Sequence, residues 1–293
     1  MTDLARREPV GRGNVAGPAG DVARAPGPAA RRASLPPWIL VPAGLAVAVL
    51  VLPLAALLLR LDWASVPAAV TSPAALDALG LSLVTATIAT AVCVVLGVPL
   101  AFVVARSSRP VAAVLRTLST LPLVLPPLVG GIALLALLGR TGLFGGALEA
   151  FGLRVPFTTT AVVIAQTFVA LPFLVISVEG ALRTAGTGFE SVAAGLGARR
   201  FTVFRRITLP LIGPGLLAGT VLCFARALGE FGATALFAGN AAGTTRTMPL
   251  AIYTAFNGAG VSEDTAIALS LMLIVVAVAV LLVMRGWRED TAR

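Results

Sequence analysis

The sequence predicts an all-α fold that crosses a membrane about six times. Three observations support this fold class. Hydrophobic residues make up 58% of the 293 residues and charged residues only 12%, whereas soluble domains contain about 25% charged residues. The mean hydropathy is +0.97. Apolar runs of roughly 20 residues, long enough for a helix to cross a bilayer, recur along the chain, whereas a membrane β-barrel would show short alternating segments.

The first segment, residues 1–36, is rich in Arg, Gly, Pro and Ala and has almost no large apolar side chains. This composition is typical of disordered chain. The apolar run that follows lacks a convincing small-residue cleavage site, so we expect the segment to be retained as a cytoplasmic tail. Residues 37–293 are expected to form the transmembrane domain.

Six apolar runs define the expected spans, with boundaries set to within about two to four residues. The runs cover approximately residues 38–59, 79–105, 117–138, 158–178, 211–238 and 265–284. In the third run, Pro122, Pro126 and Pro127 must kink the helix, because proline lacks an amide N–H and its ring clashes with the preceding turn. Together with Gly130 and Gly131, this kink either lines or gates a pathway, or only improves helix packing. The residues alone leave both interpretations open.

Arginine placement predicts the orientation of the spans, because cytoplasmic loops are enriched in Arg and Lys. The chain contains no Lys, and most arginines fall in the tail, the second and fourth connections and the C-terminal end. The arginines expected on the opposite side are Arg60, Arg140, Arg154 and Arg246. Both termini are therefore predicted to be cytoplasmic, and the net charge of +9 is attributed to membrane topology rather than to nucleic-acid binding.

Two missing residue types exclude several kinds of chemistry. Without Lys the chain has no G-x-x-x-x-G-K-[ST] phosphate loop for ATP, and without His it has no H-E-x-x-H zinc site and no Ser-His dyad. Cys93 and Cys223 lie far apart inside apolar runs, so we interpret them as small buried hydrophobes. No catalytic, cofactor or metal site is predicted, and the energy for any uphill transport must come from elsewhere.

The connection at about residues 179–210 is too long and too patterned for a simple turn. Residues 190–196 are expected to form a short helix that ends at Gly197, because glycine favours the left-handed conformation at a helix C-terminus. A second amphipathic stretch carries Phe201 and Phe204, with arginines on both sides. We interpret the connection as a docking element for a partner protein, and the alternative is an anchor on lipid headgroups.

Gly197 is followed, after nine residues, by Ile207, Leu209 and Pro210. This G-x9-I-x-L-P spacing resembles the second half of the EAA loop of ABC importer permeases. The resemblance implies that the connection contains a coupling helix, which sits in a groove of a separate ATPase subunit. Such a partner fits a chain that has no ATP site of its own.

The Glu-Ala-Ala half of the same loop matches less well. Its three positions fall on Ser191, Val192 and Ala193, so only the last alanine agrees, and Glu190 stands one position before the expected glutamate. The resemblance therefore assigns the position of the coupling helix but leaves the role of Glu190 open.

Two further segments, FARALGEFGATALFAGN (224–240) and TRTMPLAIYTAF (245–256), resemble molybdate permeases, as does LPLVLPPLVGG in the third run. They resemble the sulfate and thiosulfate permeases somewhat less. The resemblance implies a homodimeric permease with a central pathway, two ABC ATPase subunits that bind ATP and Mg²⁺, and an extracytoplasmic substrate-binding protein. Its implied cargo is molybdate or tungstate, with sulfate or thiosulfate as the alternative.

Arg226 and Glu230 are the charged residues expected within a span, and their spacing of four places them on one helix face. At about 1.5 Å per residue from Gly215, Arg226 lies roughly 16 Å deep. A lone charge at that depth costs about 2.5 to 3.5 kcal/mol, so pairing or a polar cavity must compensate. In one interpretation, Arg226 attracts the passing anion and Glu230 weakens that attraction, so that the anion is released. In the other, the pair only fixes helix packing.

Two other classes of protein fit the sequence less well. An ion-coupled secondary transporter would be expected to show an internal repeat and more charged residues within its spans. An intramembrane protease or phosphatase would need acidic residues that converge within the membrane, whereas Asp62, Asp77 and Asp264 fall in connections or at span ends. We therefore expect a transport subunit rather than an enzyme.

Overall fold

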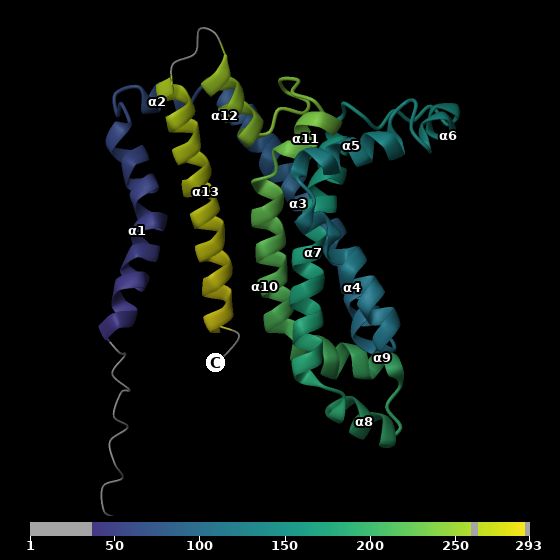
Figure 1. The fold of residues 1–293 in the computed structure, drawn as a ribbon. Helices are drawn as coiled ribbons and strands as arrows, with labels where there is room; N and C mark the ends of the chain where they lie inside the picture. The colour runs from purple at the N-terminus through teal and green to yellow at the C-terminus, as the bar shows by residue number, and fades with distance from the viewer. Residues whose placement is uncertain (1–36, 259–262, 291–293) are drawn as a thin grey trace, which may run out of the picture. The chain divides into compact units, whose positions relative to one another are not determined.

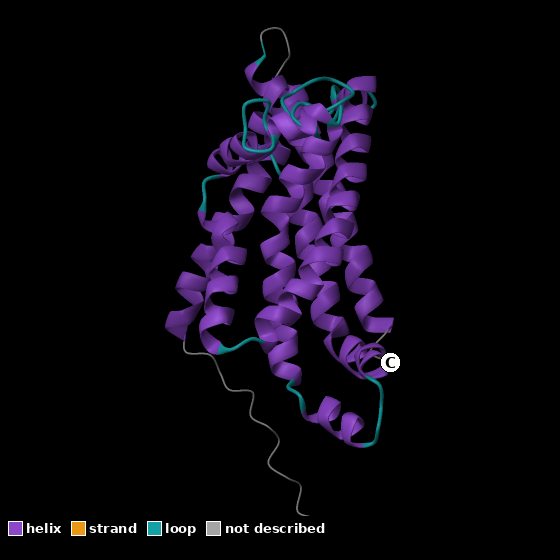
Figure 2. Ribbon diagram, turned by 90° about the vertical axis from the view of Figure 1, so that its right-hand side faces the viewer, coloured by secondary structure: helices purple, strands orange, loops and turns teal. Residues whose placement is uncertain are grey.

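The computed structural model describes residues 37–258 and 263–290, and this part of the chain is helical without any strand (Figure 2). The all-α fold class is confirmed. The expected cytoplasmic tail, residues 1–36, lies outside the described residues. The chain divides into two units after Pro53, so helix α1 (Pro37–Arg60) is described by itself. Its apolar side chains are exposed along most of its length, as the lipid-facing side chains of a spanning helix are.

The second unit contains the remaining helices (Figure 1). They are α2 (Val66–Val70), α3 (Pro73–Arg106), α4 (Arg109–Val124), α5 (Pro127–Leu138), α6 (Gly145–Ala150), α7 (Thr159–Ala185), α8 (Gly188–Gly195), α9 (Arg200–Val203), the π-helical turn η1 (Phe204–Thr208), α10 (Leu209–Leu228), α11 (Gly232–Phe237), α12 (Met248–Asn257) and α13 (Glu263–Asp290). Among the described residues, five helices are long and apolar enough to cross a bilayer, and the bent pair of α4 and α5 makes a sixth if it counts as one span. This agrees with the predicted number of spans.

Helices α3, α7 and α10 form the centre of the second unit, where α7 packs against both neighbours. The buried residues between them are mostly small, among them Ala86, Ala89, Cys93, Ala170, Cys223 and Ala227. Lipid is as apolar as these side chains, so helices in a membrane associate through close van der Waals contact, which small residues permit. The two cysteines are buried in this cluster, as the sequence predicts.

The third predicted span differs from a kinked helix. Helix α4 ends at Val124, the backbone is extended at Leu125 and Pro126, and α5 begins at Pro127 at an angle of 114° to α4. Proline disfavours the helical conformation in the residue before it, so consecutive prolines end one helix, and the second starts the next. Pro122 remains inside α4. The prolines thus break the span instead of bending it.

Several other spans also have different ends from those expected. Helix α3 begins at Pro73 rather than near residue 79, α4 begins at Arg109 rather than near residue 117, and α13 continues to Asp290 rather than ending near residue 284. Helix α7 continues to Ala185 rather than ending near residue 178. The fifth span is one continuous helix from Arg200 to Leu228, so Pro210 does not start it. It also ends before residue 238, because the chain breaks after Leu228 and α11 begins separately at Gly232.

Close packing of α10 on α7 predicts opposite effects for two Gly→Ala changes. A Cβ at Gly219 would lie 2.9 Å from the Cβ of Ser177, whereas one at Gly80 of α3 would meet no atom within 4 Å. We expect Gly219→Ala to destabilise the detergent-solubilised protein by about 1 to 3 kcal/mol through overpacking. Gly80→Ala, the matched control, should leave it unchanged or stabilise it by up to about 1 kcal/mol. Thermal melting measures both, and equal melting temperatures would contradict the packing.

Candidate functional site

The connection between α7 and α10, residues 186–208, contains α8, α9 and η1 and lies at the opposite end of the second unit from α11 and α12 (Figure 1). The short helix that the sequence predicts at 190–196 is present, but it begins earlier, at Gly188, and ends at Gly195. We refer to residues 186–208 as the α7–α10 connection.

Gly197 ends α8 in the way that the sequence predicts. Its φ is +83°, in the left-handed region. Its N–H bonds to the carbonyl of Ala194 at 3.0 Å, and the N–H of Ala198 bonds to the carbonyl of Ala193 at 3.0 Å. These two bonds form a Schellman motif, which satisfies the last carbonyls of the helix. A Cβ at Gly197 would meet no atom within 4 Å, so only the backbone conformation requires glycine here.

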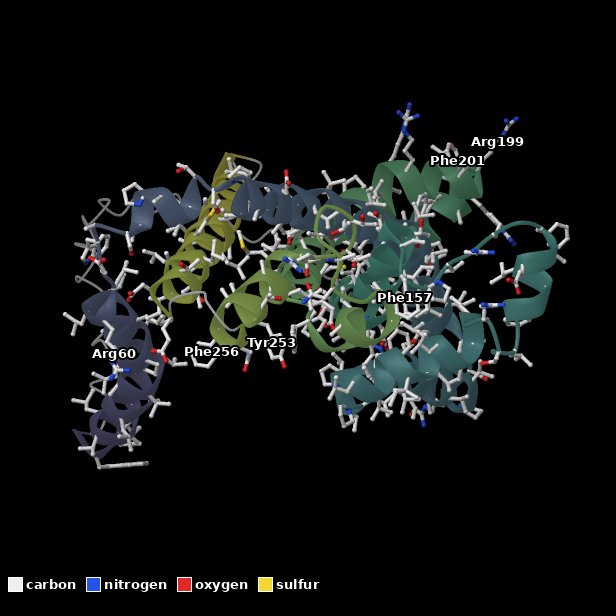
Figure 3. The ribbon with its side chains drawn as sticks, turned by 90° about the horizontal axis from the view of Figure 1, so that it is seen from above. Arg60, Phe157, Arg199, Phe201, Tyr253 and Phe256 are labelled. Carbon is white, nitrogen blue, oxygen red and sulfur yellow. The ribbon has the colours of Figure 1, made fainter. Side chains whose placement is uncertain are left out.

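Large apolar side chains of the α7–α10 connection are exposed. Phe189, Val192, Leu196 and Phe201 are 67%, 66%, 84% and 71% exposed. Ser191 is also exposed, whereas Ala193 is partly buried. In Figure 3, Phe201 and Arg199 lie at one edge of the molecule and extend away from the ribbon. The connection therefore presents an apolar surface that the described chain leaves uncovered.

The sequence grouped Phe201 and Phe204 on one amphipathic stretch of the docking element, but only Phe201 is exposed. The ring of Phe204 is partly buried and packs edge-on against Phe102 of α3, with 5.5 Å between the ring centroids. Spacing alone did not reveal this, because Phe201 and Phe204 lie on the same short amphipathic stretch and only the fold decides which one meets α3.

The I-x-L-P pattern coincides with the π-helical turn. The N–H of Leu209 bonds to the carbonyl of Phe204, five residues earlier. Pro210 lacks an N–H and its ring crowds the carbonyl four residues before it, which disfavours regular α-helix at this point. Ile207 is partly buried, and Thr208 is buried. The turn therefore directs Thr208 inward.

Glu190 holds the α7–α10 connection together. Both of its carboxylate oxygens accept hydrogen bonds from the Nη2 of Arg106, at 2.8 and 2.7 Å, and the hydroxyl of Thr208 donates to Oε1 at 2.7 Å. One side chain thus joins α8 to the end of α3 and to η1. Hydrogen bonds to charged groups are stronger than neutral ones, so Glu190 has a clear positioning role. The sequence placed this residue in the loop but not its partners, Arg106 and Thr208.

Arg226 and Glu230 form an ion pair, one of the two arrangements that the sequence left open, with 2.7 Å between Nη2 and Oε2. Glu230 lies beyond the end of α10, however, so the two residues do not share one continuous helix. The Glu230 side chain is 1% exposed, and its Oε1 accepts from the backbone N–H of Ala233 at 2.8 Å. The Arg226 side chain is 26% exposed. Glu230 therefore stabilises the break before α11, and Arg226 stays partly accessible.

The residues around the α4–α5 break have two kinds of surroundings. Pro126 and Pro127 are exposed, whereas Gly130 and Gly131 are buried. A Cβ at Gly131 would lie 2.9 Å from the carbonyl oxygen of Ala233 in α11, and one at Gly130 would lie 3.1 Å from the ring of Phe168 in α7. The glycines therefore permit close packing of α5, whereas the two prolines stay exposed at the break.

The sequence reasoning was also wrong that Arg226 and Glu230 are the only charges within spans. Glu179 of α7 is 5% exposed. Its Oε1 accepts from the Nη2 of Arg116 in α4 at 2.6 Å and from the Nε of Arg183 at 2.8 Å. The i,i+4 spacing of Glu179 and Arg183 was a usable signal, but ending the span at residue 178 hid it. The described residues contain no group of three or more His, Cys, Asp or Glu side chains placed to hold a metal ion.

The sequence of this chain is similar to those of known transport proteins. Residues 97–289 match the family described as "Binding-protein-dependent transport system inner membrane component". The chain is 54% identical over 248 residues to the molybdenum transport system permease protein ModB of Mycobacterium tuberculosis, covering 85% of this chain and 93% of the relative. It is 34% identical over 233 residues to the sulfate transport system permease protein CysT of Salmonella typhimurium, covering 77% and 84% of the two chains.

A solved structure has a similar fold at low sequence identity. A chain of the bacterial alginate ABC transporter, in complex with an alginate pentasaccharide-bound periplasmic protein, gives a TM-score of 0.68 with 18% identity. The match covers 87% of this chain and 96% of that one. It supports the arrangement of helices described above.

The bonds of Glu190 predict the stability of α8. We expect Glu190→Ala to raise amide hydrogen exchange in α8 by roughly tenfold or more, because each lost charged hydrogen bond contributes about 1.5 to 3 kcal/mol. Ser191→Ala is the matched control, since the Ser191 hydroxyl bonds only within its own turn, to the carbonyl of Thr187. Equal exchange rates in the two variants would show that Glu190 does not hold the connection.

Proposed function

The chain belongs to the binding-protein-dependent transport system inner membrane component family, and on this premise we propose that it is the permease subunit of an ABC importer for molybdate or tungstate. It carries the anion inward across the cytoplasmic membrane, while separate subunits bind and hydrolyse ATP with Mg²⁺. Two copies of the chain form the pathway, and an extracytoplasmic protein delivers the anion. Both termini face the cytoplasm.

The observation that carries the cargo assignment is the extent of similarity to relatives named for molybdenum transport. That similarity runs through nearly the whole length of the relative and is higher than the similarity to the relative named for sulfate transport. Molybdate, tungstate and sulfate are all tetrahedral dianions, so sulfate is the second candidate. The permease itself need not bind the anion tightly, because a conducting site must also release it.

The α7–α10 connection is the proposed contact with the ATPase. Phe189, Val192, Leu196 and Phe201 form an exposed apolar surface over α8, its C-terminal end and α9. Such a surface fits a groove of a partner protein. Glu190 fixes the position of α8 on α3 and η1. The chain has no Lys and therefore no phosphate loop, so it requires such a partner for energy.

The proposed pathway passes the α4–α5 break and the Arg226–Glu230 pair. Exposed prolines at 126 and 127 leave backbone carbonyls that water can reach, and irregular backbone is tolerated at membrane depth where it lines a wet cavity. Arg226 is partly exposed, so its guanidinium can attract a passing dianion, while Glu230 lowers the net charge of the site. Gly130 belongs to the packing of α5 rather than to the pathway surface.

Reconstitution tests this function. Proteoliposomes that contain the permease, its ATPase and its binding protein should accumulate molybdate only when ATP is present on the cytoplasmic side. Tungstate should compete at concentrations similar to molybdate, and sulfate should compete only in about hundredfold excess, a difference of about 2.7 kcal/mol. Equal competition by sulfate would establish the second candidate, and molybdate uptake without ATP or the ATPase would contradict the proposal.

Gly197→Asp is expected to abolish ATP-driven uptake while the permease still inserts and dimerises. The new side chain points into space that is free in the permease, so the loss arises from strain in the left-handed conformation and from a charge placed against the partner. Transport and stimulated ATP hydrolysis are both measured.

Gly152→Asp is the matched control for this change. Gly152 also has a positive φ, of +73°, and open space at its Cβ, but it follows α6 at the other end of the second unit (Figure 1). It should transport at nearly the normal rate. Normal transport by Gly197→Asp, or equal loss in both variants, would refute the assignment of the α7–α10 connection.

A further inference from the structure

Glu179 connects two helices that no sequence pattern joined. Its Oε1 accepts hydrogen bonds from the Nη2 of Arg116 at 2.6 Å and from the Nε at 3.1 Å. The same Nε also lies 3.3 Å from Oε2. Arg116 lies on α4 and Glu179 on α7, and the Glu179 side chain is 7% exposed. A multidentate arginine–carboxylate contact restrains both distance and orientation, so these bonds hold α4 against α7 in addition to the packing between the two helices.

Helix α7 leads directly into the α7–α10 connection. It ends at Ala185, and α8 begins at Gly188, so a movement of α8 reaches the last turns of α7 through a very short linker. Glu179 lies within two turns of this end. Displacement of the connection therefore acts on the part of α7 that holds Arg116.

Helix α4 leads in the other direction to the broken span. It ends at Val124, and the extended residues Leu125 and Pro126 join it to α5 at 114°. Helix α5 packs against α11, whose first turn is capped by Glu230, the partner of Arg226. Helix α4 is thus connected, through α5 and α11, to the elements that carry the proposed pathway residues.

We propose that Glu179 is a positioning residue that transmits movement of the α7–α10 connection, through Arg116, to α4 and the α4–α5 break. The inference rests on the proposed function, because it assigns the input to the ATPase and the output to the pathway. Arg183 is not part of the link, since it lies on α7 with Glu179 and cannot hold α4. The partner that Glu179 must keep is Arg116.

The test uses the complete complex in proteoliposomes and measures molybdate ions transported per ATP hydrolysed. Arg116→Gln should lower this ratio about tenfold, a typical coupling effect, while ATP hydrolysis and co-purification of the ATPase persist. A residue with only a structural role would lower uptake and hydrolysis together and leave the ratio unchanged. An unchanged ratio in Arg116→Gln would overturn the proposal.

Two controls separate the link between helices from the loss of a charge. Arg109→Gln removes an exposed arginine from the same helix, and Arg183→Gln removes the second partner of Glu179. Both should keep the ratio within about twofold of the unmodified protein. If Arg183→Gln lowers the ratio as much as Arg116→Gln, the effect comes from the negative charge of Glu179, which then lacks one of its two arginine partners. The proposal would then fail.

Arg116→Lys covers the case in which Arg116→Gln does not assemble. Lysine keeps the charge but loses the fork of donors, so an intermediate ratio is expected, and a normal ratio would overturn the proposal. Failure of both variants to assemble would also overturn it, because the pair would then serve folding alone. Failure of the proposed function is distinguishable, since the unmodified permease would then neither retain an ATPase nor take up molybdate.

Discussion

The hydrocarbon core of a bilayer cannot solvate a charge, and this constraint decides what the acidic side chains within the helical bundle contact. Glu179 and Glu230 are almost completely buried, and each has an arginine within 2.7 Å. Glu190, nearer the end of the bundle, is held in the same way by Arg106 at 2.7 Å. These carboxylates lie at the end of α7, in the α7–α10 connection and at the break before α11. Glu190 and Glu230 therefore fix points where the chain changes direction, and Glu179 joins the last turns of α7 to α4.

The hydrocarbon core of the bilayer also explains why the helix breaks lie next to small residues. A broken helix leaves backbone groups without partners, and in the membrane these must be satisfied by protein or by water in a cavity. Around the α4–α5 break, Gly131 lets the backbone of α5 approach α11, and Gly232 lets α11 approach Pro127. The break before α11 is closed by the carboxylate of Glu230, which accepts from Ala233. The irregular backbone at both breaks therefore lies against closely packed protein.

The sequence predicted what depends on local chemistry. Apolar runs predicted the long helices, Gly197 predicted the left-handed end of α8, and the prolines predicted where the third span is disrupted, although as a kink rather than as the break that is present. It did not predict what depends on neighbours far along the chain. Phe204 meets Phe102, and Glu190 meets Arg106, only because α3 passes beside the connection. The ends of spans were also set wrongly, because hydropathy falls at Glu179 although the helix continues, and the Glu179–Arg116 link was missed for that reason.

We propose above all that the apolar surface of the α7–α10 connection contacts an ATPase rather than lipid, and site-directed photocrosslinking tests this contact most directly. Leu196 is 84% exposed and Leu143, near α6 at the other end of the second unit, is 77% exposed. A benzophenone amino acid in place of Leu196, in membranes that contain the whole importer, should form a covalent adduct with the ATPase subunit, and one in place of Leu143 should not. Adducts with lipid alone at Leu196 would contradict the account.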